Sequence, residues 1–297
     1  MSEPDVRLHL ISREERALSA EGRDQPILEV EDLTLDFAGV RALDGVSFSV
    51  EPGELFAVIG PNGAGKTSVF NCISGVYRPT RGRVRFDGRD VTGMRPYRIA
   101  ALGVARTFQN VEVFPTMTVV ENLLLGRYHH MRSGVLSGAA WWGRASAEEV
   151  RNRHRVEEII DFLEIEHLRH HRVGALPIGL QKRVELGRAL AMEPTLLLLD
   201  EPVAGMNQEE TEDTVRFVID VNEELGISIV LVEHDMGVVM EISNRVLVLD
   251  FGARIALGPP AEVARDPAVL AAYLGGALGH EPPVPGSVDA GARSVGS

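Results

Sequence analysis

The chain has 297 residues, of which 44% are hydrophobic and 25% are charged, and its formal net charge is −13. This composition is typical of a globular protein, and the acidic balance argues against a broad nucleic-acid-binding face. No apolar run reaches the ~18 residues that span a bilayer, and the charged N-terminus lacks the apolar core of a signal peptide. One cysteine allows no internal disulfide, so we expect a cytoplasmic protein.

The first third of the chain is predicted to form strands around one helix. Residues 1–26 precede the strands as an extension. The β-rich segments cover 27–37, 46–50 and 55–60. Alternation in the first segment indicates a half-buried antiparallel strand, and the unbroken apolar run over 55–59 indicates a buried parallel one. A helix is predicted over 66–74 and another strand over 84–86.

The middle of the chain, about residues 110–183, is predicted to be a helical insertion, because β-branched runs become scarce there. Residues 146–168 have the spacing of an amphipathic helix. Its predicted apolar side consists of Val150, Val156, Ile159, Ile160 and Leu163. Ser146, followed three residues later by Glu149, predicts a capping box at the start of this helix.

The last third alternates predicted strands and helices and then becomes polar. In chain order we expect a strand over 195–200, a helix over 207–226, a strand over 227–235, a hairpin over 244–258 and a helix over 260–275. The hairpin is expected to turn at Gly252. The tail, 276–297, is rich in Pro, Gly, Ser and Ala and is predicted to be disordered.

The stretch GPNGAGKTS fits the phosphate-loop pattern G-x-x-x-x-G-K-[ST] and lies between a predicted buried strand and a predicted helix. Its glycines let backbone N–H groups surround a phosphate, and the helix N-terminus adds partial positive charge. Lys66 is predicted to reach the β- and γ-phosphates, and the Thr67 hydroxyl to bind Mg²⁺. The predicted ATP-binding residues are Gly60, Pro61, Asn62, Gly63, Ala64, Gly65, Lys66, Thr67 and Ser68.

The stretch LLLLDEP is a predicted buried strand that ends in two adjacent carboxylates, Asp200 and Glu201. Because side chains alternate along a strand, these two carboxylates can have different roles. Asp200 is suited to binding Mg²⁺, and Glu201 to orienting or deprotonating an attacking water. An acidic strand end alone commonly just meets solvent, but together with the glycine loop it indicates a nucleotide site.

Two polar residues and the cysteine complete the candidates. His234 ends another predicted buried strand, near the ligand crevice of an open α/β sheet, although a hydrogen-bonded histidine at the rim is the alternative. Gln109, in VARTFQN, draws attention only by its position at the junction with the helical insertion. Cys72 is predicted to fill the core.

Over about residues 27–275 these motifs resemble, in the same order, the nucleotide-binding subunits of ABC transporters. The resemblance implies an α/β fold: a P-loop NTPase sheet core of the ABC ATPase type with an antiparallel β subdomain and an α-helical subdomain. It implies that 60–67 is the Walker A loop, 196–201 the Walker B strand and 204–207 the D-loop. Glu201, His234 and Gln109 are then the catalytic glutamate, the switch histidine and the Q-loop glutamine.

Further roles follow from the same resemblance. Thr67, Gln109 and Asp200 are the implied ligands of Mg²⁺. Phe37 lies where the family stacks an aromatic ring on adenine, with ordinary strand packing as the alternative. The signature segment, which acts on ATP held by a partner subunit, is Leu176, Pro177, Ile178, Gly179 and Leu180.

The stretches NVEVFPTMTVVENLLLG, LDEPVAGMN and DPAVLAAYLG resemble the ATPases of branched-chain amino acid importers of the LivG type. The resemblance implies ATP and Mg²⁺ as cofactors and a second ABC ATPase subunit as partner, a heterodimer being favoured over a homodimer. It also implies membrane permease subunits, an external substrate-binding protein, a location at the inner face of the membrane and no nucleic-acid partner. Systems for urea or short amides, and the lipopolysaccharide-export ATPase, share much of this pattern.

Two departures from the family pattern concern the partner's site. The usual signature is L-S-G-G-Q, and Pro177 has no hydroxyl in place of the serine. Proline is tolerated in the first turn of a helix, where we expect Pro177 to lie. The usual D-loop aspartate is Asn207. A non-transport ABC ATPase and a regulatory subunit that does not turn over are the alternatives, although the chain has neither heptad repeats nor a basic face.

Two other features are assigned no function. His167, His170 and His171 lack cysteine or carboxylate support for a metal and are predicted to form a solvated turn. Trp141 and Trp142 are more simply packed inside the insertion than exposed to a membrane partner.

Overall fold

The computed structural model describes residues 25–37, 39–128 and 144–275. The predicted disordered tail, the two tryptophans and most of the predicted extension lie outside the described residues. None of the described helices is long and apolar enough to cross a bilayer.

The larger sheet has six strands in the order β10-β9-β3-β8-β7-β6. They are β3 (Leu55–Ile59), β6 (Val104–Arg106), β7 (Leu196–Asp200), β8 (Ser228–Val232), β9 (Arg245–Asp250) and β10 (Ala253–Gly258). All neighbours are parallel except β10, which folds back antiparallel onto β9. Strands β3, β7 and β8 are buried along their whole length, which explains their unbroken apolar sequences.

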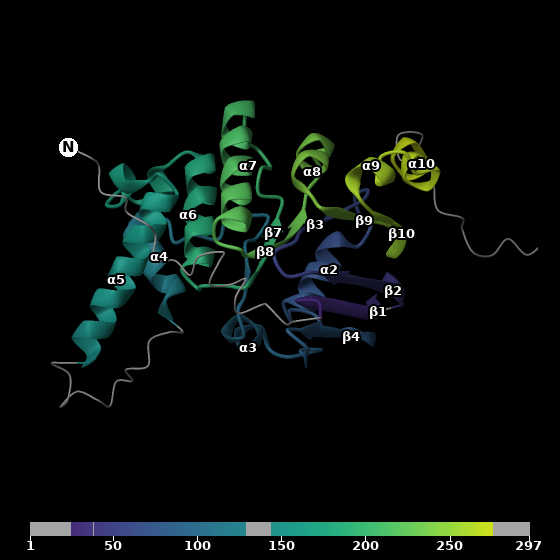
Figure 1. The fold of residues 1–297 in the computed structure, drawn as a ribbon, viewed down its shortest axis with the longest axis horizontal. Helices are drawn as coiled ribbons and strands as arrows, with labels where there is room; N and C mark the ends of the chain where they lie inside the picture. Colours follow the sequence, from purple (N-terminus) through teal and green to yellow (C-terminus); the bar gives the residue numbers. More distant parts are fainter. Residues whose placement is uncertain (1–24, 38, 129–143, 276–297) are drawn as a thin grey trace, which may run out of the picture.

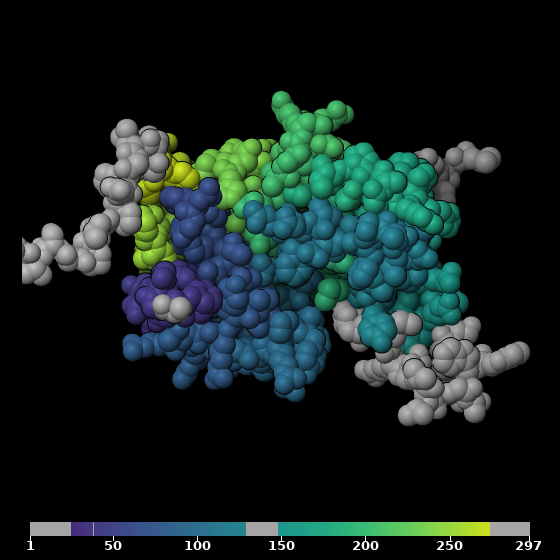
Figure 2. Space-filling view, turned by 180° about the vertical axis from the view of Figure 1, so that it is seen from behind, coloured from purple at the N-terminus to yellow at the C-terminus, as the bar shows by residue number. Residues whose placement is uncertain are grey.

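The smaller sheet is antiparallel, with the strand order β2-β1-β4-β5. Its strands are β1 (Leu28–Phe37), β2 (Val40–Val50), β4 (Arg81–Phe86) and β5 (Arg89–Asp90). The predicted strands at 46–50 and 84–86 fall within β2 and β4, and the one at 27–37 matches β1 except for its first residue. In Figure 1 this sheet lies at the opposite end of the molecule from helices α4 (Val119–Gly126) and α5 (Arg144–Phe162), and Figure 2 shows the same separation from behind.

Alternate side chains of the parallel strands build two hydrophobic layers. Phe56, Val58 and Val230 face one way and pack with the small sheet and with helix α2 (Lys66–Ile73), so that α2 lies between the two sheets. Leu197 and Leu231 face the other way and pack with the helical layer. That layer comprises α4, α5, α6 (Ile178–Leu190) and α7 (Gln208–Glu223). Hydrophobic layers therefore cover both faces of the parallel strands.

The remaining described helices are short. They are α3 (Pro96–Ala101), α8 (Met236–Ile242), α9 (Pro260–Val263), α10 (Pro267–Gly275) and the 3-10 turns η3 (Glu166–Leu168) and η4 (Val173–Ala175). The helical subdomain predicted over 110–183 stays a prediction. Helix α6 continues past residue 183, and buried side chains of α6 share one hydrophobic layer with the sheet.

Three expectations about helices α5, α9 and α10 were wrong. Helix α5 begins at Arg144, so Ser146 lies inside the helix and does not precede it as a capping-box residue. Val150 is 63% exposed, whereas the other predicted apolar positions of this helix are buried. The last helix is divided into α9 and α10, because Pro267 begins a new helix and Asp266 before it leaves the helical conformation.

Candidate nucleotide site

The glycine-rich loop joins β3 to α2, and its conformation requires glycine. Gly60 has a φ of 149°, and a Cβ there would lie 2.1 Å from the Leu249 carbonyl oxygen. Gly65, the N-cap of α2, has a φ of 102°, and its Cβ would lie 2.8 Å from the Ala42 carbonyl oxygen. The loop thus crosses directly over neighbouring backbone, where a side chain at either glycine would not fit. Glycine also allows the backbone conformations in which N–H groups converge on an anion.

Beside this loop lies an open cleft of about 290 Å³. It is lined by Ala42, Asn62, Gly63, Ala64, Gly65, Lys66, Thr67, Ser68, Gln109, Glu201 and His234. Residues from five separate parts of the chain therefore meet where the sequence predicts an ATP site. Most of the predicted ATP-binding residues and all three predicted catalytic residues line this one cleft.

Lys66 is 6% exposed, and its ammonium donates to two carbonyl oxygens of its own loop, Gly60 at 2.7 Å and Pro61 at 3.1 Å. Burial lowers the pKa of Lys66, while the nearby charges of Glu201 and Asp200 oppose this shift. The ammonium is thus held inside its own loop by two carbonyl oxygens, close to the carboxylates of Glu201 and Asp200.

Glu201 lies between the other two predicted catalytic side chains and contacts both. Gln109 Nε2 donates to Glu201 Oε2 at 2.8 Å, and His234 Nε2 lies 2.5 Å from Glu201 Oε1. Gln109 and His234 come from different parts of the chain, so the fold brings these three residues together as the sequence predicts. A carboxylate held from both sides in a polar cleft can orient a water or accept its proton.

Asp200 is 3% exposed and bonds to Arg106, whose Nη2 lies 2.8 Å from Asp200 Oδ2. The Asp200 backbone N–H donates to the hydroxyl of Thr107 at 3.4 Å. A role for Arg106 was not predicted from the sequence. The available signal was an arginine at the end of a short strand, three residues before Gln109.

Glu185 of α6 is a second residue that the sequence analysis missed. Its buried Oε1 accepts the backbone N–H groups of Phe108 at 3.2 Å and Glu112 at 3.3 Å. Burial raises the pKa of Glu185, and these two hydrogen bonds oppose the shift. The loop that carries Gln109 is therefore tied to helix α6.

Phe37 does not line the cleft. Its ring is 42% exposed and meets Tyr77 edge-on, with centroids 5.0 Å apart. Both the adenine-stacking role and the strand-packing alternative stay predictions.

The signature segment does not line this chain's own cleft either. Pro177 is the N-cap of α6, with φ −54° and ψ 156°, and not a residue of the first helical turn as predicted from the sequence. Ile178, the first helical residue, is 42% exposed, whereas Gly179 is buried against Glu210. The D-loop residue Asn207 caps α7 in a capping box with Glu210, a role that asparagine and aspartate both fill well.

A strand–glycine loop–helix unit with two acidic residues at the end of another parallel strand of the same sheet defines a P-loop nucleotide-binding protein. Residues 43–204 match the family model described as "ABC transporter", and residues 253–278 match "Branched-chain amino acid ATP-binding cassette transporter". The chain belongs to the ABC transporter ATP-binding family and is an ATPase of that family.

Named relatives cover most of the chain. It is 41% identical over 254 residues to the "High-affinity branched-chain amino acid transport ATP-binding protein BraF" of Pseudomonas aeruginosa, covering 84% of this chain and 98% of that protein. It is 38% identical to LivG of Escherichia coli, a protein described in the same words, with the same coverage. A crystal structure of a nucleotide-free ATP-binding cassette from an ABC transporter matches with a TM-score of 0.73 and 32% identity, covering 84% of this chain and 99% of that one.

Proposed function

We propose that this chain hydrolyses ATP to drive the import of branched-chain amino acids through a membrane permease. The observation that carries the proposal is the Glu201 carboxylate, held by Gln109 and His234 at the edge of the cleft that the glycine loop opens. The names of the relatives support the substrate class. ATPases of related systems for urea or short amides are the alternative.

In this proposal the cleft residues have three separate tasks: to bind the phosphates, to activate the water and to hold the catalytic carboxylate. Lys66 and the loop N–H groups bind the phosphates, and Glu201 orients the attacking water and accepts its proton. His234 and Gln109 hold the Glu201 carboxylate in position for that step.

Two oxygen donors that line the cleft, together with the adjoining Asp200, also fit Mg²⁺. Thr67 offers a hydroxyl, Asp200 a carboxylate and Gln109 an amide oxygen, which are the hard oxygen ligands that this ion prefers. The Gln109 amide nitrogen, not its oxygen, bonds to Glu201, so the oxygen is available to the ion. Held by these residues, Mg²⁺ would neutralise the negative charge that develops on the phosphates.

The partners follow from the position of the signature segment. Because this segment lies away from the chain's own cleft, its ligand is proposed to be ATP on a second ABC ATPase subunit, with a heterodimer favoured. The pair would be held at the inner face of the membrane by permease subunits, which receive substrate from an external binding protein.

The test uses the complex that copurifies with this chain from solubilised membranes, reconstituted into vesicles with external labelled leucine or labelled urea. We expect ATP-dependent uptake of leucine. Glu201→Gln should keep ATP binding and lower both hydrolysis and uptake, while Glu223→Gln, an exposed acid at the far end of α7, should change neither.

Three outcomes would contradict the proposal. Unchanged hydrolysis with Glu201→Gln would overturn the catalytic assignment. Uptake of urea but not leucine would overturn the substrate class, and recovery of soluble partners alone would overturn the transporter role.

A further inference from the structure

The Asp200 carboxylate, a proposed magnesium ligand, is itself held by a buried arginine. The side chains of Arg106 and Asp200 are 8% and 3% exposed, and 2.8 Å separates Nη2 from Oδ2. A charge-assisted hydrogen bond of this length between buried groups is strong and directional. Arg106 therefore fixes the orientation of the carboxylate and leaves the second oxygen, Oδ1, for an ion.

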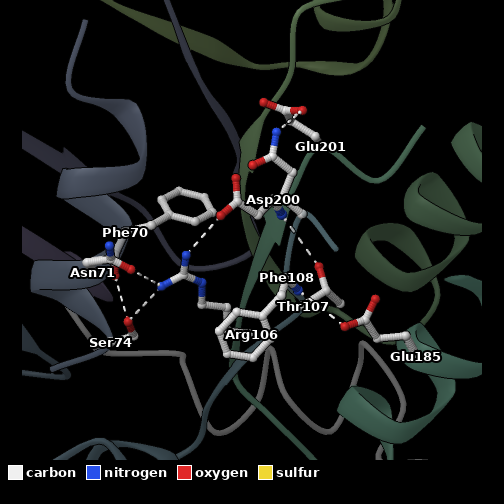
Figure 3. A network of polar contacts seen from close by, with 10 residues as sticks. Phe70, Asn71, Ser74, Arg106, Thr107, Phe108, Glu185, Asp200 and Glu201 are labelled. Carbon is white, nitrogen blue, oxygen red and sulfur yellow. Dashed lines mark hydrogen bonds and ion pairs between the residues drawn. The ribbon is translucent and has the colours of Figure 1, made fainter. Parts of the chain in front are cut away.

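Arg106 is in turn anchored to helix α2. Its Nη1 donates to Asn71 Oδ1 at 2.7 Å and to Ser74 Oγ at 3.0 Å. The guanidinium carbon lies 5.5 Å from the ring centre of Phe70 and 5.0 Å from that of Phe108. Figure 3 shows the guanidinium pointing at once toward the helix and toward Asp200.

This anchoring connects the three elements that carry the proposed magnesium ligands. Thr67 lies one helical turn before Asn71 on α2, so both project from similar sides of that helix. Asp200 ends β7, and Gln109 follows Arg106 by three residues. One guanidinium thus bridges the helix that bears Thr67 to the strand that bears Asp200.

We propose that Arg106 is the positioning residue of the magnesium site. It sets the separation between the Thr67 hydroxyl and the Asp200 carboxylate by bonding to both of their elements. This inference rests on the magnesium site proposed above. Groups that hold a metal ligand typically change metal affinity by about 10- to 100-fold when they are removed.

The role predicts a particular dependence on the kind of ion. Mg²⁺ requires nearly ideal octahedral geometry, whereas Ca²⁺ accepts irregular arrangements at longer distances. Loss of Arg106 should therefore weaken Mg²⁺-dependent binding of ATP far more than Ca²⁺-dependent binding. A residue that merely supports the fold would affect both ions alike.

The experiment measures ATP affinity of the full-length chain carrying Glu201→Gln, so that no turnover occurs, in EDTA, in Mg²⁺ and in Ca²⁺. With Arg106→Met added, we expect the strengthening by Mg²⁺ to fall by about 10-fold or more. The affinities in EDTA and in Ca²⁺ should stay within about threefold, since the phosphate loop is intact and Ca²⁺ tolerates the change. Arg106→Lys should recover only part of the loss, because an ammonium lacks the planar fork that reaches two elements.

Arg127→Met is the matched control. Arg127 is also buried and bonds to Glu193, Asn152 and the Ala191 carbonyl, away from the cleft-lining residues. It should leave the Mg²⁺ dependence unchanged. Asn71→Ala removes one anchor and keeps the ion pair, so it should show a smaller loss in the same direction, and it carries the test where Arg106→Met does not fold.

The outcomes separate this inference from the proposed site. If Mg²⁺ does not strengthen ATP binding to the parent chain, the magnesium site itself fails. If it does, the role of Arg106 is overturned by undiminished Mg²⁺ dependence in folded Arg106→Met, by equal losses with Mg²⁺ and Ca²⁺, or by the same loss in Arg127→Met. Undiminished dependence in Asn71→Ala overturns it where Arg106→Met does not fold.

Discussion

Asp200 and Glu201 are adjacent in the chain, yet their carboxylates meet different partners because the backbone turns between them. Glu201 has a φ of 51°, a left-handed conformation that costs about 1–3 kcal/mol for a residue other than glycine. Its N–H donates to the Val232 carbonyl at 2.9 Å, and its carbonyl accepts from Lys182 Nζ at 2.8 Å. These contacts hold the turn that directs Asp200 toward Arg106 and Glu201 into the cleft.

Cys72 should be unreactive as long as the chain is folded. It is fully buried in α2, and burial raises the pKa of its thiol from 9.0 to about 12. Between these values the unfolded chain ionises while the folded chain does not, so this group lowers the free energy of unfolding as pH rises from about 9 toward 12. N-ethylmaleimide at pH 8 should modify the chain quickly in urea and slowly without it, as followed by mass spectrometry. Rapid modification of the folded chain would contradict this burial.

The elements that a local sequence pattern identifies directly, such as a buried strand by its unbroken apolar run, were predicted well. The apolar runs of β3, β7 and β8 and the glycine loop before α2 follow from local pattern alone. The start of α5 was missed because Ser146 and Glu149 match a capping pattern although the helix already begins at Arg144. The break before Pro267 was missed because the apolar residues over 260–275 fit one continuous helix. Local pattern also cannot report pairs such as Arg106 with Asp200, which are 94 residues apart.

At the scale of elements, helices α4 and α6 cross closely enough to require Gly126. A Cβ at that position would lie 2.4 Å from the Arg188 carbonyl oxygen and 2.9 Å from the Ala191 Cβ. Gly126→Ala should therefore lower the free energy of unfolding by about 1–3 kcal/mol, since overpacking against backbone outweighs the better helix propensity of alanine. Urea unfolding measures this change. Gly258→Ala, whose Cβ would lie 3.4 Å from Glu262 Oε2, is the control and should be nearly neutral. Equal losses in both variants would contradict the close crossing.

At the scale of the whole molecule, the residues of the proposed site divide between two chains. The glycine loop, Glu201 and His234 line this chain's own cleft, whereas the signature segment at the start of α6 does not. In the proposed pair, Pro177 therefore bears on the partner's turnover and Glu201 on this chain's own. The resemblance to the family implied this division, and the missing serine hydroxyl predicted a weaker contribution to the partner's site. The structure adds that Pro177 precedes the helix, so the N–H groups of the first turn of α6 remain free to face a phosphate.

Pro177→Ser should raise turnover at the partner's site. The φ of −54° and ψ of 156° at this position also suit serine, so the hydroxyl is added without moving the start of α6. One hydrogen bond to a phosphate oxygen is worth about 1.5–3 kcal/mol, or roughly 10- to 100-fold, as an upper limit on the gain. In the reconstituted complex, Glu201→Gln silences this chain's own site, and the remaining ATP hydrolysis reports the partner's. Pro177→Ala is the matched control, because it removes the proline ring without supplying a hydroxyl. Equal hydrolysis in the serine and alanine variants would show that the missing hydroxyl does not limit the partner's site.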